Sequence, residues 1–144
     1  MLILEDALDH ALIADGAEHD FSGLDPSYSQ HRSYSTRHEG AVPGEVQSVT
    51  VLYGIPVTID GVRFIEGDHS KVGNGGWFES MDIDLLVDDV WKSIPPHTTI
   101  SNTLDAAVPF QVFDFGLPTP TMVGGIRLSG VAGGAEVRVN IAEL

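Results

Sequence analysis

Two stretches of the sequence mix aromatic rings with side chains that form hydrogen bonds. The stretch 27–38 reads SYSQHRSYSTRH, and the stretch 66–78 reads EGDHSKVGNGGWF. Rings of this kind can stack on the apolar face of a ligand, while imidazole, guanidinium and amide groups fix its orientation. The candidate ligand-binding residues are Tyr28, His31, Arg32, Tyr34, Arg37, His69, Asn74 and Trp77. The alternative is that both stretches are surface loops that only connect strands and close one end of the fold.

The loop GNGGWF at 73–78 leaves a choice between ligand contact and core packing. Glycine allows backbone angles that other residues avoid, and a large ring buries a large apolar area when it enters a core. Trp77 and Phe78 are adjacent in the sequence, and adjacent residues of a strand point to opposite sides. We therefore predict that one of these two rings stays at least partly exposed.

Signatures of catalysis are missing from the sequence. The six histidines form no HExxH pattern, no GxSxG elbow is present, and there is neither a Walker loop nor a cysteine nucleophile. A glycosidase needs two carboxylates on either side of a cleft, and none of the 21 acidic residues is marked out as such a pair by its surroundings. The sequence predicts a noncatalytic protein.

One irregular segment has the oxygen ligands that calcium prefers. HDFSGLDPS, residues 19–27, contains Asp20 and Asp25, and Ca²⁺ takes six to eight oxygens from a loop that can wrap around it. The segment does not match an EF-hand, which needs a tighter series of acids. The alternative is that Asp25 starts a turn with Pro26 while Asp20 is simply solvated.

The charge of the chain limits its partners. The formal net charge is −14 over 144 residues, so contacts with nucleic acid phosphates and with anionic membranes are disfavoured, whereas cations are favoured. No stretch approaches the roughly 20 apolar residues that span a bilayer. The apolar content of 42% is typical of a soluble globular domain, and we expect one domain over residues 1–144.

Alternation of apolar and polar residues predicts strands with one face in a core. The clearest cases are SVTVLY (48–53), MDIDLLV (81–87), VPFQVFDF (108–115) and EVRVNIA (136–142). Their expected core-facing residues are Val49, Val51, Tyr53, Met81, Ile83, Leu85, Val108, Phe110, Val112, Val137, Val139 and Ile141. Turns between short strands are predicted at Tyr53-Gly54, Asp60-Gly61, Gly75-Gly76, Pro95-Pro96, Pro118 to Pro120, Gly124-Gly125 and Gly133-Gly134. Many short strands at such spacing indicate an all-β sandwich or barrel.

Two parts of the chain differ from this pattern. The segment LEDALDHALIA near the N-terminus fits either a short helix or a first strand. Residues 15–44 are polar and show no sustained periodicity, and a connection of this length in a compact domain is usually functional. Loops on a rigid β scaffold are where binding sites tend to lie, so this region is expected to contribute to one.

An ordered set of motifs from about residue 46 to the end resembles a known family. The motifs are Gly75-Gly76-Trp77-Phe78, Trp91, Ile126-Arg127, Gly130, Gly133-Gly134 and Ile141-Ala142-Glu143-Leu144. In this order they resemble the galactose-binding-like β-sandwiches, which include discoidin (coagulation factor 5/8 type C) domains and related carbohydrate-binding modules. The first third departs from the family pattern, because Asp15-Gly16 is not followed by the family's tryptophan. The resemblance implies a jelly-roll β-sandwich of antiparallel sheets.

The resemblance also implies a function. Such a domain would be a noncatalytic carbohydrate-binding module, with the candidate ligand-binding residues as sugar contacts. A glutamate near the end of the last strand often closes a calcium site in this family, so Asp20, Asp25 and Glu143 are the expected ligands of a structural calcium. An extracellular, cell-surface or virion location is expected. The alternative is a structural protein of a virion, tail or cell-surface assembly that uses the same sandwich for contacts with protein neighbours.

Overall fold

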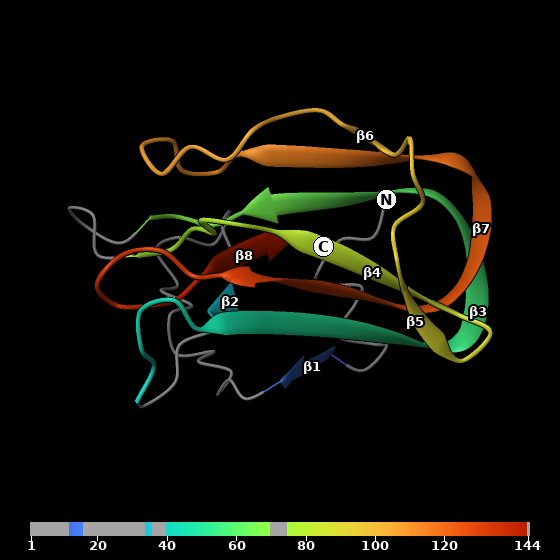
Figure 1. Cartoon of the computed structure of the whole chain (residues 1–144), viewed down its shortest axis with the longest axis horizontal. Helices are drawn as coiled ribbons and strands as arrows, with labels where there is room; N and C mark the ends of the chain where they lie inside the picture. The colour runs from blue at the N-terminus through green and yellow to red at the C-terminus, as the bar shows by residue number, and fades with distance from the viewer. Residues whose placement is uncertain (1–11, 16–33, 36–39, 70–74, 144) are drawn as a thin grey trace.

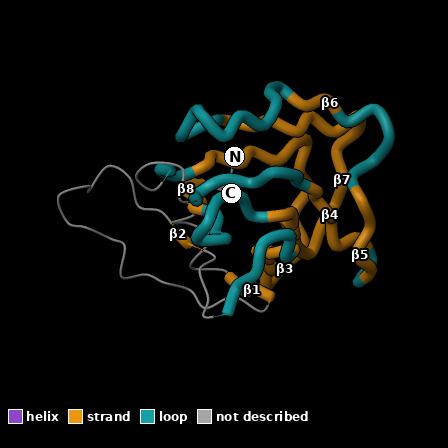
Figure 2. The backbone as a smooth tube through the Cα atoms, turned by 60° about the vertical axis from the view of Figure 1, so that its left-hand side comes forward, coloured by secondary structure: helices purple, strands orange, loops and turns teal. Residues whose placement is uncertain are grey.

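The described part of the chain consists of strands and loops. The computed structural model describes residues 12–15, 34–35, 40–69 and 75–143 (Figure 1). Its strands are β1 (Leu12–Asp15), β2 (Tyr34–Ser35), β3 (Val46–Glu66), β4 (Asp82–Val87), β5 (Val90–Ser93), β6 (Thr99–Ile100), β7 (Val112–Val131) and β8 (Asn140–Glu143). Figure 2 shows no helix among these residues, so the all-β prediction is confirmed for them. Accordingly, they include no helical segment with the length and apolarity needed to cross a membrane.

Two long strands, β3 and β7, run through both layers of the fold. Residues 46–52 of β3 pair with residues 125–131 of β7, and residues 57–65 pair with residues 112–123. Between these parts the register shifts, and both strands bend from one layer into the other at the right-hand edge of Figure 1. Each long strand therefore supplies one half to each sheet.

The remaining strands extend the two sheets. One layer has the order β1, first half of β3, second half of β7, β4 and β5. The other layer has the order β2, β8, second half of β3, first half of β7 and β6. Every one of these pairings is antiparallel. This is the antiparallel sandwich that the sequence predicts.

Glycine and proline bend the long strands instead of ending them, so the turns predicted at four places inside β3 and β7 were wrong. Tyr53-Gly54, Asp60-Gly61, Pro118 to Pro120 and Gly124-Gly125 all lie within these two strands. A Cβ on Gly61 would come within 2.8 Å of the Phe115 carbonyl oxygen, and one on Gly125 within 2.7 Å of the Val51 carbonyl oxygen. The missing side chains allow the backbones to approach closely while the sheet curls.

Aromatic rings form the centre of the core. The ring of Phe64 in β3 lies 5.8 Å from that of Phe113 in β7 and is stacked on it. Phe64 also meets Phe78 in an edge-to-face arrangement, at a ring distance of 5.9 Å. The buried aliphatic residues of this core include Val49, Val51, Ile83 and Leu85, as the alternation in SVTVLY and MDIDLLV predicts, and also Ile126 and Leu128. The sandwich is thus held together mainly by apolar burial between its layers.

The phase predicted for VPFQVFDF was wrong. Val108, Phe110 and Val112 are 46%, 37% and 37% exposed, whereas Phe113 and Phe115 are buried. Strand β7 begins only at Val112, and the residues before it form a loop. The segment offers apolar residues on both of its faces. The face with Phe113 and Phe115 enters the core, because these two residues lie in regular strand geometry.

Two other segments differ in part from expectation. EVRVNIA buries Val137, Val139 and Ile141 as predicted, but strand β8 begins at Asn140, because Val137 has a positive φ of 46° in a turn. Of LEDALDHALIA, residues 12–14 belong to strand β1, and the rest lies outside the described residues.

Candidate functional site

Four described loops meet at one end of the sandwich. Residues 67–69, 75–81, 101–111 and 132–139 lie at the left-hand end of Figure 1, opposite the bends of β3 and β7. We call this end the loop end. Gly67 N–H donates to Asn140 O at 2.7 Å, so the loop that follows β3 is tied directly to the start of β8.

A buried acid, Glu66, lies at the base of the loop end. It is the last residue of β3 and has the same phase as Val62 and Phe64, so it points into the core, and it is 0% exposed. Burial raises the pKa of Glu66, while the hydrogen bond and charge of His69 and a backbone hydrogen bond from Phe78 act in the opposite direction. Among the residues that the structure describes, its Oε1 has no hydrogen-bond partner. Sequence reasoning missed Glu66, although its phase with Val62 and Phe64 was a usable signal.

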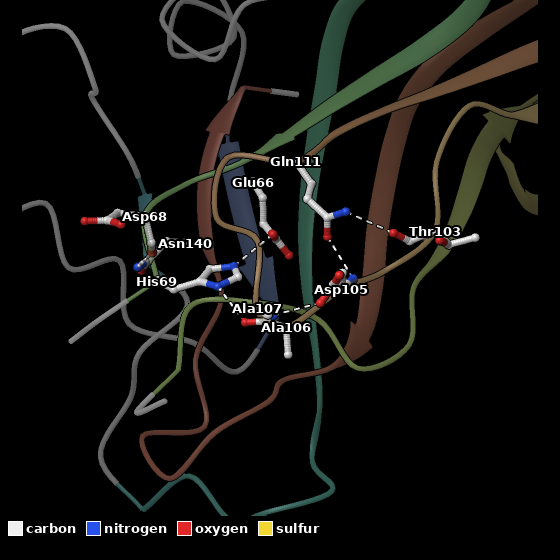
Figure 3. Close-up of polar contacts among 9 residues, drawn as sticks. All are labelled: Glu66, Asp68, His69, Thr103, Asp105, Ala106, Ala107, Gln111 and Asn140. Atoms are coloured by element: carbon white, nitrogen blue, oxygen red, sulfur yellow. Dashed lines mark hydrogen bonds and ion pairs between the residues drawn. The ribbon is translucent and has the colours of Figure 1, made fainter. Parts of the chain in front are cut away.

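His69 connects Glu66 to the opposite loop (Figure 3). Its Nε2 lies 2.9 Å from Glu66 Oε2, and its Nδ1 lies 3.0 Å from the carbonyl oxygen of Ala106. The ring of Trp77 lies 5.0 Å from the imidazole and is tilted against it. The histidine side chain is only 9% exposed. In this arrangement both imidazole nitrogens of His69 face acceptors inside the protein.

The loop that contains Ala106 is ordered by two polar side chains. Gln111, 7% exposed, accepts from Asp105 N–H at 2.8 Å and donates to Thr103 O at 3.0 Å (Figure 3). The carboxylate of Asp105 accepts from Ala107 N–H at 2.9 Å, which closes a tight turn. Residues 103–111, named here the Phe110 loop, therefore have a defined shape.

Phe110 is an exposed ring at the loop end that sequence reasoning placed in the core. It is 37% exposed and has a φ of 58°, a backbone region that large side chains seldom adopt. Its N–H donates to Gly67 O at 3.3 Å, which keeps it beside Asp68, an exposed acid. An aromatic ring kept at the surface on a strained backbone is a candidate ligand contact.

Trp77 and Phe78 are both buried, at 8% and 1% exposure, so the prediction that one of them stays partly exposed was wrong. They do point to different sides: Phe78 enters the main core, and Trp77 lies under His69 and Gly133. The side of the segment on which Trp77 lies is therefore covered too, by His69 and Gly133. A structural role therefore accounts for both rings, and a sugar contact of Trp77 stays a prediction.

The double glycine lets this segment pass close to its neighbours. Gly75 and Gly76 have φ values of 150° and 118°. A Cβ on Gly76 would come within 2.7 Å of Asp68 O and 2.9 Å of the His69 Cα. Gly76 thus serves the close approach of this segment to Asp68 and His69 rather than the display of a ring.

Gly133→Ala is expected to lower the free energy of unfolding by about 1–3 kcal/mol, the usual range for overpacking a tight site. A Cβ at this position would overlap the indole nitrogen of Trp77. The backbone N–H of Gly133 itself donates to Trp77 O at 2.9 Å, so the glycine has little room to move away. Urea unfolding followed by tryptophan fluorescence measures the loss. Gly54→Ala is the control, because its Cβ would meet nothing within 4 Å. Equal stability of the two variants would show that Trp77 is not packed against this glycine.

Cross-strand ion pairs lie elsewhere on the sheets. Arg127 donates to Asp84 at 2.9 Å, and its guanidinium carbon lies 4.6 Å from the centre of the Trp91 ring. Arg63 bonds Asp114 at 2.5 Å and thereby lowers the pKa of that carboxyl. An open hollow of about 370 Å³ is lined by Asp60, Gly61, Val62, Arg63, Asp114, Phe115 and Gly116. These pairs join neighbouring strands, so a structural role accounts for them.

The described parts of both candidate stretches lie at the loop end. Tyr34 of β2 pairs with Ile141 of β8, which pairs on its other side with Glu66 of β3. The backbone of Tyr34 is therefore two strand spacings, about 10 Å, from that of Glu66. His69 and Trp77 lie at the same end. The other candidate ligand residues lie outside the described residues: Tyr28, His31, Arg32, Arg37 and Asn74.

The predicted calcium ligands fall largely outside the described residues. Asp20 and Asp25 belong to the undescribed part, and the backbone of Glu143 pairs with Ile65 in strand β8. Within the described ranges, no group of three or more histidine or acidic side chains could hold a metal ion. Calcium binding by Asp20, Asp25 and Glu143 stays a prediction.

The fold is similar to those of solved carbohydrate-binding modules. The family 32 module of NanJ from C. perfringens, solved with galactose, covers 95% of this chain and 92% of its own, with a TM-score of 0.62 and 19% identity. CpGH89CBM32-5 from Clostridium perfringens, solved with GalNAc-β-1,3-galactose, covers 95% and 94%, with a TM-score of 0.64 and 15% identity. A chain of the Streptococcus pneumoniae β-galactosidase BgaA covers 93% and 89%, with a TM-score of 0.67 and 12% identity.

Sequence comparison assigns no family to the chain. No protein-family model and no curated protein matches it. At identities of 12–19% the structural similarity concerns the fold, and it extends over most of the chain. It confirms the fold implied by the sequence motifs: the chain is an antiparallel β-sandwich with the same architecture as these solved family 32 carbohydrate-binding modules.

Proposed function

We propose that the chain is a noncatalytic carbohydrate-binding module that binds its glycan at the loop end. The observation that supports this most directly is the exposed ring of Phe110, which is held beside hydrogen-bonding loops at one end of this fold. Two modules of the same architecture were solved with galactose and with GalNAc-β-1,3-galactose. Fold alone does not fix a ligand, so the site carries the proposal.

The chemistry of the loop end suits a sugar. A pyranose ring has an apolar face that can stack on Phe110, and hydroxyl groups that can donate to the exposed carboxylates of Asp68 and Asp105. Each sugar hydroxyl exchanges hydrogen bonds with water for hydrogen bonds with the protein, so the net gain is small. Binding by one isolated module is therefore expected to be weak. Glu66, the buried acid of this end, is bonded to His69 and 0% exposed, a placing that favours a structural role over catalysis.

Charge restricts the class of glycan. The chain has a net charge of −14, and the exposed charged side chains named at the loop end are the acids Asp68 and Asp105. Carboxylates repel sialic and uronic acids but accept from neutral hydroxyls and attract amino groups. The proposed ligands are therefore neutral or amino sugars.

A structural calcium and an extracellular setting complete the proposal. Asp20, Asp25 and Glu143 are the proposed calcium ligands, all of oxygen type as Ca²⁺ requires. A module of this kind would act outside the cell or on a cell surface or virion, where it raises the local concentration of a linked protein on its glycan.

A glycan array tests the function directly. The purified protein is expected to bind neutral or amino sugars and not their sialylated counterparts, and the array is run with calcium and again with EDTA. A signal lost only in EDTA supports the calcium site, and an unchanged signal contradicts a calcium requirement. A folded protein without any hit would contradict the proposed function and favour the alternative, a structural protein that binds protein neighbours.

A further inference from the structure

We propose that Glu66 and His69 are positioning residues that hold the Phe110 loop against β3 through one shared proton. The consequence for glycan binding rests on the proposed function, whereas the proton-linked attachment of the loop stands on the geometry alone. Neither residue needs to touch the ligand. Their role is to determine where Phe110 and Asp105 lie.

The geometry of His69 fixes where its protons are. Ala106 O can only accept, so Nδ1, 3.0 Å away, carries a hydrogen and donates it. On the other side, Nε2 lies 2.9 Å from Glu66 Oε2, and this contact needs one hydrogen between the two atoms. That hydrogen belongs either to an imidazolium that faces a carboxylate or to a carboxylic acid that faces a neutral imidazole. In both forms the pair holds two protons.

Loss of one of these protons breaks the link. A neutral imidazole that keeps its Nδ1 hydrogen would turn the lone pair of Nε2 toward the lone pairs of Glu66 Oε2 at 2.9 Å. The carboxylate would then be charged in a site where its side chain is 1% exposed. Burial of an ion without a compensating partner is unfavourable, so the loop and the strand would separate.

The surroundings supply few other charges. On the described segments packed against the pair, the titratable side chains are Asp68, beside His69, and Asp105, beside Ala106. The segment 75–78 contributes the Trp77 ring and the Phe78 backbone. Strand β8 contributes Asn140, whose Nδ2 donates to Asp68 O at 2.5 Å. Two neighbouring carboxylates favour the protonated pair.

The direction of the pH effect follows from the same arrangement. Burial raises the pKa of Glu66 above its ordinary value of 4.5, so the folded chain keeps a proton that the unfolded chain releases above that pH. The stability from this proton is fully present below pH 4.5 and is lost as the pH rises through the folded-state pKa. The Phe110 loop is therefore held firmly at acid pH and loosened at alkaline pH.

The test follows the loop and the Glu66–His69 pair from about pH 5 to about pH 9, a range above the ordinary pKa of a glutamate. Nitrogen NMR reports whether the shared hydrogen of the pair lies on the His69 ring. Exchange of the Phe110 amide, corrected for its intrinsic pH dependence, reports opening of its 3.3 Å bond to Gly67 O. We expect protection of this amide to fall about tenfold or more, which corresponds to about 1.4 kcal/mol, as the pH rises and the Glu66–His69 pair loses its shared proton. Constant protection across the whole pH range would overturn the proposal.

Variants separate a proton-linked role from a merely structural one. In Glu66→Gln an amide N–H can donate to Nε2 at every pH, so protection is expected to be retained and pH-independent. His69→Ala removes the link, so protection is expected to be low at every pH. Asp82→Asn, which removes an exposed carboxylate at the start of β4, is the control and should follow the unmodified protein. A Glu66→Gln profile parallel to that of the unmodified protein would overturn the proposal.

Glycan affinity provides the second readout. If the array identifies a sugar, its affinity should decline with the same midpoint as the amide protection, and Glu66→Gln should abolish this decline. An affinity that is independent of pH in the unmodified protein, despite loop opening, would overturn the positioning role. If no sugar binds, the proposed function fails, while the amide and ring measurements still decide whether the proton holds the loop.

Discussion

Phe110→Ala is expected to weaken glycan binding by about tenfold or more, equivalent to about 1.4 kcal/mol, and to leave the free energy of unfolding within about 0.5 kcal/mol. Exposed aromatic rings supply a large share of the affinity at binding sites because they bury apolar area with few rotatable bonds. Phe110 is 37% exposed, so its removal leaves no large cavity. Titration calorimetry or competition on the array measures the affinity, and urea unfolding measures the stability.

Two further variants make the Phe110 result specific. Phe110→Tyr keeps the ring and should keep most of the affinity. Val112→Ala removes an apolar side chain of equal exposure, 37%, at the start of β7 and should change affinity little. Equal binding by Phe110→Ala and the unmodified protein would place the glycan site away from this loop.

Phe78→Ala is expected to lower the free energy of unfolding by about 3–5 kcal/mol, the range for large-to-small changes of buried aromatic residues. Phe78 is 1% exposed, and its ring meets that of Phe64 edge to face at a ring distance of 5.9 Å. Phe64 in turn stacks on Phe113, so the cavity would open at the centre of the core. Urea unfolding at constant pH measures the loss.

Comparison with Phe110→Ala isolates the effect of burial, because the chemical change is the same in both variants. If Phe78→Ala does not fold, Phe78→Leu keeps most of the volume, and its loss should be below about 1.5 kcal/mol. A loss below about 1 kcal/mol for Phe78→Ala would show that the ring is not a core element.

The fold could largely be predicted from the sequence. Alternation placed Val49, Val51, Ile83 and Leu85 in the core, where the structure also has them. Such alternation reports which face of a strand is buried, because successive side chains point to opposite sides. The ordered glycine and tryptophan motifs indicated the sandwich whose architecture the solved modules share.

The local sequence pattern could not predict burial where it allowed either face of a segment to enter the core. In VPFQVFDF both alternating sets contain large apolar residues, so only packing against Phe64 decided that Phe113 is inside and Phe110 is outside. Trp77 and Phe78 point to different sides of their segment, and only the tertiary fold covers both sides. Likewise, a glutamate in a sequence is expected to face solvent. Glu66 is buried instead, because it has the same phase as the core residues in β3.

The sequence by itself determined the strand-rich fold, the acidic surface and the loop segments in which ligand-binding side chains occur, since these depend on composition and on period. Only the tertiary structure decided that His69 lies between Glu66 and Ala106, 37 residues further along the chain. Contacts between loops depend on how the ends of β3 and β7 meet, and no local periodicity encodes that meeting. The loop end is therefore a product of chain topology rather than of any single motif.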